Sequence, residues 1–265
     1  MSFFQLIVLA LIQGVSEFLP VSSSAHLALV APLTGWADQG LAFDAAVHVG
    51  TLAAVVLHLR PELVGLVRDG LPGRDPVQRA LLVGLCIATL PALLVGAFAA
   101  DWIEAWLRNP LLIAVTTIVF GLLLGAADRW GHRVDVVESV GWRRGLIIGL
   151  AQALALVPGT SRSGVTITAG LALGLTREAA ARYSFLLSIP IIAAAGGWGF
   201  FSGLRDGGTF EFARFLSAAA ISGLFAWLTI AAFLAWLRWA GMAPFVIYRL
   251  ALGLALLVLF WPDAG

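Results

Sequence analysis

Long stretches without a single charged residue constrain the fold of this chain more than any other feature. A helix needs about 20 apolar residues to cross the hydrocarbon core of a bilayer, and a helix satisfies its own backbone hydrogen bonds there. Six stretches approach or exceed that length, so we predict six transmembrane helices. They are residues 45–59 (extending back toward Leu41), 80–100, 109–127, 183–204, 215–237 and 239–262, the last interrupted only by Arg249.

The composition of the 265 residues agrees with a membrane protein. Hydrophobic residues make up 60% of the chain and charged residues 12%, whereas soluble domains carry about 25% charged residues. The surplus apolar surface must therefore face membrane lipids. The net charge of +1 argues against a nucleic-acid partner. The single cysteine, Cys86, excludes an intramolecular disulfide.

Two further apolar segments, residues 3–35 and 145–174, hold polar groups where a transmembrane helix would have none. The first contains Glu17 and Pro20, and the second contains Arg162 in a turn rich in glycine and serine. A proline costs a helix interior about 3 kcal/mol, and a charge at mid-membrane costs about as much. We therefore expect two re-entrant hairpins, each with a half-helix in, a polar tip and a half-helix out.

The two halves of the chain resemble each other. Residues 13–23 (QGVSEFLPVSS) match residues 152–161 (QALALVPGTS) with one residue deleted. Three predicted spans follow each hairpin, and because three is odd, the second half would be inverted in the membrane. We therefore predict an all-α polytopic membrane protein of six transmembrane helices plus two re-entrant helical hairpins. It would form a single domain over residues 1–265, with inverted-topology repeats at about residues 1–128 and 140–262.

The arginines predict an orientation in the membrane. All 16 basic residues are arginines, and two of them, Arg162 and Arg249, lie within apolar segments. If the first hairpin opens on the side of the N-terminus, eleven of the others fall on one side of the membrane and three on the opposite side. The arginine-rich side is expected to be cytoplasmic. Both termini and the first hairpin would then face outward.

The first hairpin carries side chains suited to phosphate chemistry, in the order Gln13, Glu17, Ser22, Ser23, Ser24 and His26. Gln13 and Glu17 share one face of a helix. The serines follow Pro20 at the start of the next half-helix, where hydroxyls and unpaired N–H groups favour anions. Glu17 would repel an anion, so we expect it to bind a divalent cation, orient His26 or transfer a proton. The alternatives are a neutral, hydrogen-bonded Glu17 and a packing role for His26.

The second hairpin carries complementary groups, namely Gly159, Thr160, Ser161, Arg162, Ser163 and Gly164. The glycines permit close approach of the backbone, and the hydroxyls are hydrogen-bond donors. The guanidinium of Arg162 is a planar fork of donors that suits phosphate oxygens. We therefore predict that both tips form one phosphate-binding site. The alternative is an Arg162–Glu17 ion pair that only locks the hairpins together.

These motifs resemble a known family. Residues 13–26 (QGVSEFLPVSSSAH) and 158–164 (PGTSRSG) are similar to the two signature motifs of the bacterial undecaprenyl-diphosphate phosphatases, also called bacitracin-resistance proteins. Residues 43–51, 183–190 and 244–249 also resemble that family. The resemblance therefore covers nearly the whole chain.

The resemblance implies a reaction, a location and a set of central residues. The family removes the terminal phosphate of a C55 polyprenyl diphosphate lipid in the bacterial plasma membrane, which regenerates the carrier for cell-wall synthesis and confers bacitracin resistance. Glu17, Ser23, His26 and Arg162 would be the catalytic residues, with Mg²⁺ or Ca²⁺ as cofactor. Gln13 stands where the family often has a second glutamate, which leaves Glu17 as the main carboxylate for the metal.

Several roles stay open at this point. Ser23 activated by His26 is the preferred nucleophile, and attack by His26 itself or by water are alternatives. We expect Arg249, beside Tyr248, to hold a hairpin through a carbonyl or Glu178 rather than to contact substrate. Asp44 and His48 could equally face the site or form a pair at a helix end.

The remaining expectations concern the loops, the partners and the competing functions. Residues 60–79 and 128–144 are expected to be solvated loops. A homodimer is compatible with the sequence. Inverted repeats with broken helices are also a plan of transporters, so a transporter of the lipid phosphate is the main alternative to an enzyme, and a non-catalytic lipid-binding scaffold is the third.

Overall fold

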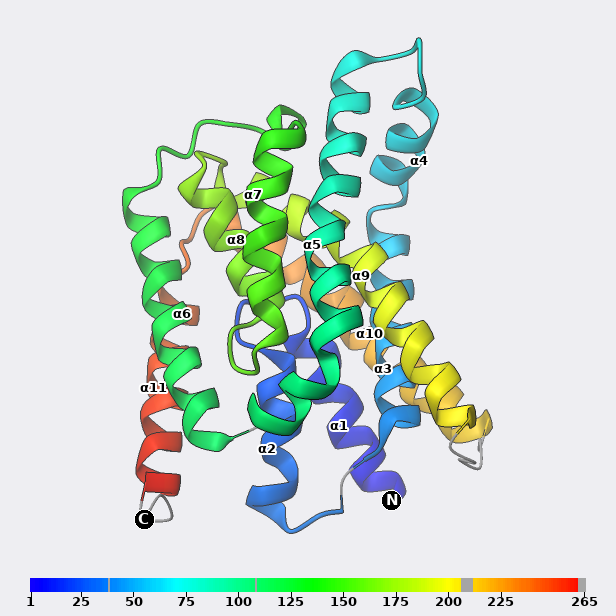
Figure 1. Ribbon diagram of the computed structural model, residues 1–265, viewed down its shortest axis with the longest axis vertical. Helices are drawn as coiled ribbons and strands as arrows, with labels where there is room; N and C mark the ends of the chain where they lie inside the picture. Colours follow the sequence, from blue (N-terminus) through cyan, green and yellow to red (C-terminus); the bar gives the residue numbers. More distant parts are fainter. Residues whose placement is uncertain (38, 108, 206–211, 262–265) are drawn as a thin grey trace.

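The chain folds into a bundle of helices, drawn in Figure 1. The computed structural model describes residues 1–37, 39–107, 109–205 and 212–261. In these ranges the predicted all-α fold is confirmed. The helices are α1 (Phe3–Ser16), α2 (Ser23–Thr34), α3 (Leu41–His58), α4 (Arg60–Asp69), α5 (Pro76–Leu107), α6 (Pro110–Trp130), η1 (Val137–Ser139), α7 (Trp142–Ala153), η2 (Leu154–Leu156), α8 (Arg162–Ala172), α9 (Arg177–Arg205), α10 (Phe212–Leu237) and α11 (Ala243–Phe260).

The long helices have the length and the surface of membrane spans. Among the described residues, α5, α6, α9, α10 and α11 are long and apolar enough to cross a bilayer. A sixth span results if α3 and α4, which are bent by 71° relative to each other, count as one broken element. Large apolar side chains such as Phe98 and Val258 point outward, as a lipid-facing surface requires. The protein is therefore a multi-pass membrane protein, and the number of six spans stays a prediction.

Several helix boundaries differ from the expectation, and the added ends carry charged residues; α5, for example, spans Pro76–Leu107 instead of residues 80–100. Residues 60–69 were expected to be a loop and instead form α4, which has Pro61 and Glu62 in its first turn and Arg68 in its last turn. These are favourable helix start and end residues. α9 begins at Arg177, before the charge-free stretch, because a helix continues beyond the lipid wherever its charged residues find partners.

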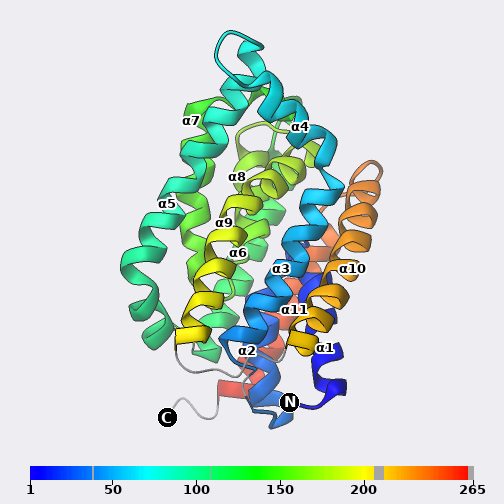
Figure 2. The same cartoon turned by 90° about the vertical axis from the view of Figure 1, so that its right-hand side faces the viewer.

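The two broken segments form the predicted pairs of half-helices. α1 runs from one end of the molecule to its middle, and α2 returns to the same end (Figure 1). α7 and η2 enter from the opposite end, and α8 returns there. The view turned by 90° shows α4 at the end far from the start of α1 (Figure 2). The tips of the two hairpins consequently meet in the middle of the bundle.

Each hairpin packs against a long helix from the other half of the chain. α1 lies against α10, and α7 lies against α5. Glycines permit both contacts: a Cβ atom on Gly14 would lie 2.5 Å from the carbonyl oxygen of Ser222, and one on Gly149 would lie 2.5 Å from that of Ala88. This exchange is what an inverted repeat would produce. The repeat and its boundaries stay a prediction.

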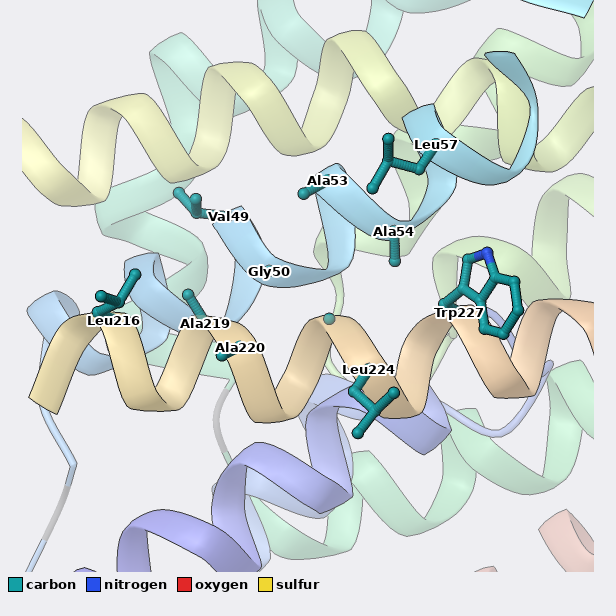
Figure 3. A pocket seen from close by; sticks show the side chains of 11 residues that line it. Val49, Gly50, Ala53, Ala54, Leu57, Leu216, Ala219, Ala220, Leu224 and Trp227 are labelled. Carbon is teal, nitrogen blue, oxygen red and sulfur yellow. The ribbon is translucent and has the colours of Figure 1, made fainter. Parts of the chain in front are cut away.

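The helices α3 and α10 are in close contact, and α1 of the first hairpin packs against α10. Small residues face each other across this contact, beneath an apolar groove lined also by Leu57 and Trp227 (Figure 3). A Cβ atom on Gly50 would lie 2.1 Å from the carbonyl oxygen of Ala219. Since that neighbour is backbone, it cannot move without shifting α10. The spacing of α3 and α10 therefore depends on glycine at position 50.

We predict that Gly50→Ala lowers the melting temperature of the purified protein. Overpacking of a close contact typically costs about 1–3 kcal/mol. Gly65→Ala on α4 is the matched control, because a Cβ atom there would meet nothing within 4 Å and alanine is the better helix former. Differential scanning fluorimetry in detergent measures both. Equal melting temperatures for the two variants would contradict this packing.

Candidate active site

The tips of the two hairpins are joined by an ion pair and by a hydrogen bond. Arg162 donates from a terminal nitrogen to Glu17 Oε1 at 2.8 Å. The hydroxyl of Ser163 donates to the carbonyl oxygen of Leu19, also at 2.8 Å. The side chains of Glu17 and Arg162 are 8% and 13% exposed. The pair is therefore largely, but not completely, shielded from solvent.

The carboxylate of Glu17 is the centre of this cluster. Its second oxygen, Oε2, accepts from Gln13 Nε2 at 2.9 Å and from the Ser23 hydroxyl at 2.7 Å. Hydrogen bonds to an ionised group are about twice as strong as neutral ones. Glu17, Gln13, Ser23 and Arg162, which were predicted as site residues from sequence, thus lie in direct contact.

Two serines with the same unusual backbone conformation immediately precede the returning half-helices. Ser22 precedes α2 with φ = 72°, and Ser161 precedes α8 with φ = 71°. Such a conformation costs a non-glycine residue about 1–3 kcal/mol and tends to occur at functional sites. If the two halves are repeats, this match pairs Ser22 with Ser161, whereas the sequence alignment pairs Ser23 with Ser161. Ser23 and Arg162 then hold equivalent places, and both donate to Glu17.

The starts of α2 and α8 offer backbone donors to an anion. Within the described part of the chain, the N–H groups of Ser23, Ser24 and Ala25 in α2, and of Arg162 and Ser163 in α8, have no acceptor. The start of a helix also carries about half a positive charge. Two such starts at the hairpin tips, with the guanidinium of Arg162 beside them, make a site suited to phosphate.

Arg249 of α11 fixes both tips through their carbonyl oxygens. It is 0% exposed, and its guanidinium donates to Pro20 of the first tip and to Gly159 and Thr160 of the second. A fourth bond, from Nε, goes to the carbonyl oxygen of Thr117 in α6. These contacts confirm the expected structural role, with carbonyls rather than Glu178 as partners. They also satisfy backbone groups of the irregular tips, which have no helical partners.

The predicted substrate-binding residues of the second tip lie in place but are largely engaged with the protein itself. Ser161 accepts from the N–H of Gly164 at 3.1 Å. Gly159 has φ = +87°, and a Cβ atom there would lie 2.2 Å from the hydroxyl of Thr116. The hydroxyl of Thr160 is buried and has no hydrogen-bond partner among the described residues. Whether these residues also contact substrate stays a prediction.

His26 is placed at the edge of the cluster. Its Nδ1 lies 2.7 Å from the carbonyl oxygen of Ser22, and its Nε2 lies 2.5 Å from the hydroxyl of Tyr248. The hydroxyl of Ser23 is bonded to Glu17 instead of His26. The neighbour of His26 on α11 is thus a residue that the sequence analysis noted only as adjoining Arg249.

Two weaker candidates and one residue that sequence analysis missed complete the site. His48 Nδ1 lies 2.6 Å from the carbonyl oxygen of Asp44 in its own helix, and whether Asp44 and His48 face the site stays a prediction. The missed residue is Ser184 of α9, whose carbonyl oxygen accepts from Arg162 at 3.2 Å. The accepting atom belongs to the backbone, so the residue type at position 184 gave little indication of this contact.

Comparison with known proteins agrees with the motifs. The family described as "Bacitracin resistance protein BacA" matches residues 6–255. The chain belongs to this family. The undecaprenyl-diphosphatase of Chromohalobacter salexigens is 50% identical over 97% of this chain and 99% of its own length. Those of Alteromonas mediterranea and Nitrosococcus oceani are each 49% identical, over 97% and 98% of this chain and 98% and 100% of their own lengths.

The possible ligands for a divalent cation at this site are side-chain oxygens of Glu17 and Gln13. The described residues contain no group of three acidic, histidine or cysteine side chains around one point. However, Gln13 Oε1 is a buried oxygen without a partner among the described residues, and it belongs to the side chain that contacts Glu17. Mg²⁺ is commonly bound by one or two carboxylates, water and substrate phosphates. The donor set therefore fits a cation that shares its ligands with a phosphate substrate.

We predict that Arg249→Met lowers both the melting temperature and the activity, because four carbonyl oxygens each lose a hydrogen bond from the guanidinium. Each unsatisfied buried group costs about 1–3 kcal/mol. Arg249→Lys keeps the charge without the planar fork and should not restore stability. Arg60→Met is the control, since Arg60 is exposed. If Arg249→Met melted at the same temperature as the wild type, the structural role of Arg249 at the hairpin tips would be contradicted.

Proposed function

We propose that this protein hydrolyses undecaprenyl diphosphate to undecaprenyl phosphate and inorganic phosphate, and so recycles the lipid carrier used in envelope synthesis. It is a membrane phosphatase of the bacitracin resistance family. The observation that carries the proposal is the meeting of two sequence-distant motifs at one buried site, where Arg162 and two helix starts offer donors to phosphate.

Substrate binding follows from the charges at the tips. Arg162 and the fully buried Arg249 outweigh the single carboxylate of Glu17, so the site attracts an anion. The terminal phosphate would take the free N–H groups at the starts of α2 and α8, and Arg162 would exchange part of its contact with Glu17 for phosphate oxygens. The polyprenyl chain would remain in the lipid.

Ser23 is the proposed nucleophile. Its oxygen attacks the terminal phosphorus, its proton passes to Glu17, to which it is already bonded, and undecaprenyl phosphate departs with the bridging oxygen. Water then attacks the phosphoserine, Glu17 returns its proton to the departing Ser23 oxygen, and inorganic phosphate is released. Phosphoryl transfer depends mostly on positioning and charge neutralisation, which Arg162 supplies. His26 is proposed as the base for the water step.

A divalent cation, Mg²⁺ or Ca²⁺, is proposed as cofactor. Glu17 and the free amide oxygen of Gln13 would hold it together with the substrate. It would neutralise charge on the phosphate groups.

We predict that a chelator abolishes phosphate release and that Mg²⁺ restores it. Gln13→Glu should lower the Mg²⁺ concentration needed for half-maximal activity, because it adds a carboxylate beside Glu17. Titration of activity with Mg²⁺ measures this for both proteins. Full activity in excess chelator would show that the metal proposal is wrong.

The decisive assay is phosphate release from polyprenyl diphosphate by purified protein. We expect Arg162→Ala, Glu17→Gln, Ser23→Ala and His26→Ala each to lose at least about 100-fold in kcat/KM, the scale of a lost catalytic group. Ser217→Ala on α10 is the control, because its hydroxyl donates to its own helix. Equal release by all variants would refute the site assignment.

The same assay separates the enzyme from a transporter, which the opposed hairpins would also suit. No release by wild type would favour transport. Rapid quenching with terminally labelled substrate should place the phosphoryl group on Ser23, whereas label on His26 would refute the proposed nucleophile.

We further propose that the protein lies in the bacterial plasma membrane with both termini and the site on the external side, as the arginine distribution indicates. The homodimer stays a prediction. In a Cys86→Ser background, Ala37→Cys should react with an impermeant thiol reagent in intact cells, and Val77→Cys only after the membrane is opened. Both positions are exposed. The opposite labelling pattern would reverse the orientation.

A further inference from the structure

Tyr248 of α11 contacts His26 of α2, although the two residues lie far apart in the sequence. Tyr248 is 43% exposed, so its hydroxyl could be solvated by lipid headgroups or water. Instead it lies 2.5 Å from His26 Nε2. The two rings are nearly parallel, with an interplanar angle of 10° and centroids 5.7 Å apart. A partly exposed tyrosine is thus turned toward one imidazole nitrogen.

The contact of Nδ1, the other ring nitrogen of His26, determines which nitrogen of the imidazole carries the proton. Nδ1 lies 2.7 Å from the carbonyl oxygen of Ser22, and a carbonyl oxygen can only accept. Nδ1 therefore carries the proton of the neutral imidazole, and Nε2 holds the lone pair. It follows that the hydroxyl of Tyr248 is the donor and Nε2 the acceptor. The nitrogen that Tyr248 covers is the basic one.

The position of Tyr248 is set by its neighbour in the chain. Arg249 is clamped to the carbonyl oxygens of Pro20, Gly159 and Thr160, so α11 is anchored at the level of the hairpin tips. The helices α2, α6 and α11 also pack together around Ala25 and Leu256. A hydroxyl carried by such an anchored helix holds its partner better than one carried by a loop.

We propose that Tyr248 is a positioning residue for His26: its hydroxyl holds the imidazole in the Nδ1–H form with Nε2 at the edge of the phosphate site. This rests on the proposed function only in the claim that His26 acts in the reaction. The substrate or attacking water then replaces the Tyr248 hydroxyl at Nε2. Without that hydroxyl, the imidazole would rotate or change its protonated nitrogen.

The test removes the hydroxyl and keeps the ring. Tyr248→Phe should lower kcat about 10-fold with KM changed less than about 2-fold, because orientation of a catalytic group is lost while substrate binding is kept. Tyr183→Phe is the matched control. Tyr183 is the other tyrosine of the chain, and its buried hydroxyl has no partner among the described residues. Its removal should leave kcat unchanged.

A chemical measurement separates positioning from a general loss of structure. Diethyl pyrocarbonate acylates unprotonated imidazole nitrogen, and peptide mass spectrometry assigns the modified histidine. Modification of His26 should be several-fold faster in Tyr248→Phe than in wild type and in Tyr183→Phe. The exposed His132 serves as the internal reference. Equal rates at His26 would overturn the proposal even if kcat fell, and a faster rate with unchanged kcat would overturn the positioning role.

A ¹⁵N spectrum of the histidine-labelled protein provides the second readout, since the chain has four histidines. His26, assigned with His26→Asn, should show a protonated Nδ1 in wild type and a mixture of forms in Tyr248→Phe. A protonated Nε2 in wild type would overturn the proposal. If wild type releases no phosphate, the proposed function fails, and the labelling and the spectrum still decide whether Tyr248 covers Nε2.

Discussion

The ion pair between Glu17 and Arg162 is the interaction on which the other features of the site depend. Removing one partner of a buried pair leaves an uncompensated charge, which typically costs about 3–5 kcal/mol, and neither residue would be stable alone inside an apolar bundle. Together they tie a hairpin from one end of the molecule to a hairpin from the other. In the proposed function, the pair opens to admit a phosphate group. The same contact would then both stabilise the resting fold and mark the position of the bound anion.

The irregular backbone around that pair needs its own partners. Arg249 supplies four hydrogen bonds to carbonyl oxygens of the tips and of α6, and glycines let α1 and α7 approach the long helices closely. The carbonyl groups of Pro20, Gly159 and Thr160 are therefore bound, whereas N–H groups at the starts of α2 and α8 are not, within the described ranges. The centre of the protein therefore has hydrogen-bond donors that lack acceptors. The oxygens of a phosphate group are acceptors and would complement them.

The sequence predicts the hairpins because a proline and charges inside apolar segments are expensive, so Glu17, Pro20 and Arg162 mark the breaks by themselves. It also predicts that the two tips share a site, since each charge requires a partner. The register of the tips was not predictable, because the backbone of Ser22 and Ser161 depends on tertiary contacts. Arg249 could be assigned a structural role, but its partners are carbonyls that belong to any residue type. The contact between His26 and Tyr248 links residues far apart in the chain and follows only from the packing of α2 against α11.

The most direct test of this account is an experimental structure with a non-hydrolysable methylene diphosphonate analogue of the substrate. The account predicts that the terminal phosphonate lies between the starts of α2 and α8, within hydrogen-bonding distance of the Ser23 and Ser24 N–H groups and of the Arg162 guanidinium. It also predicts that the hydrogen bond from Arg162 to Glu17 Oε1 is broken, because the guanidinium turns to the phosphonate oxygens. A phosphonate bound elsewhere, for example near Arg182 at the far end of the bundle, with the Glu17–Arg162 pair intact, would contradict it.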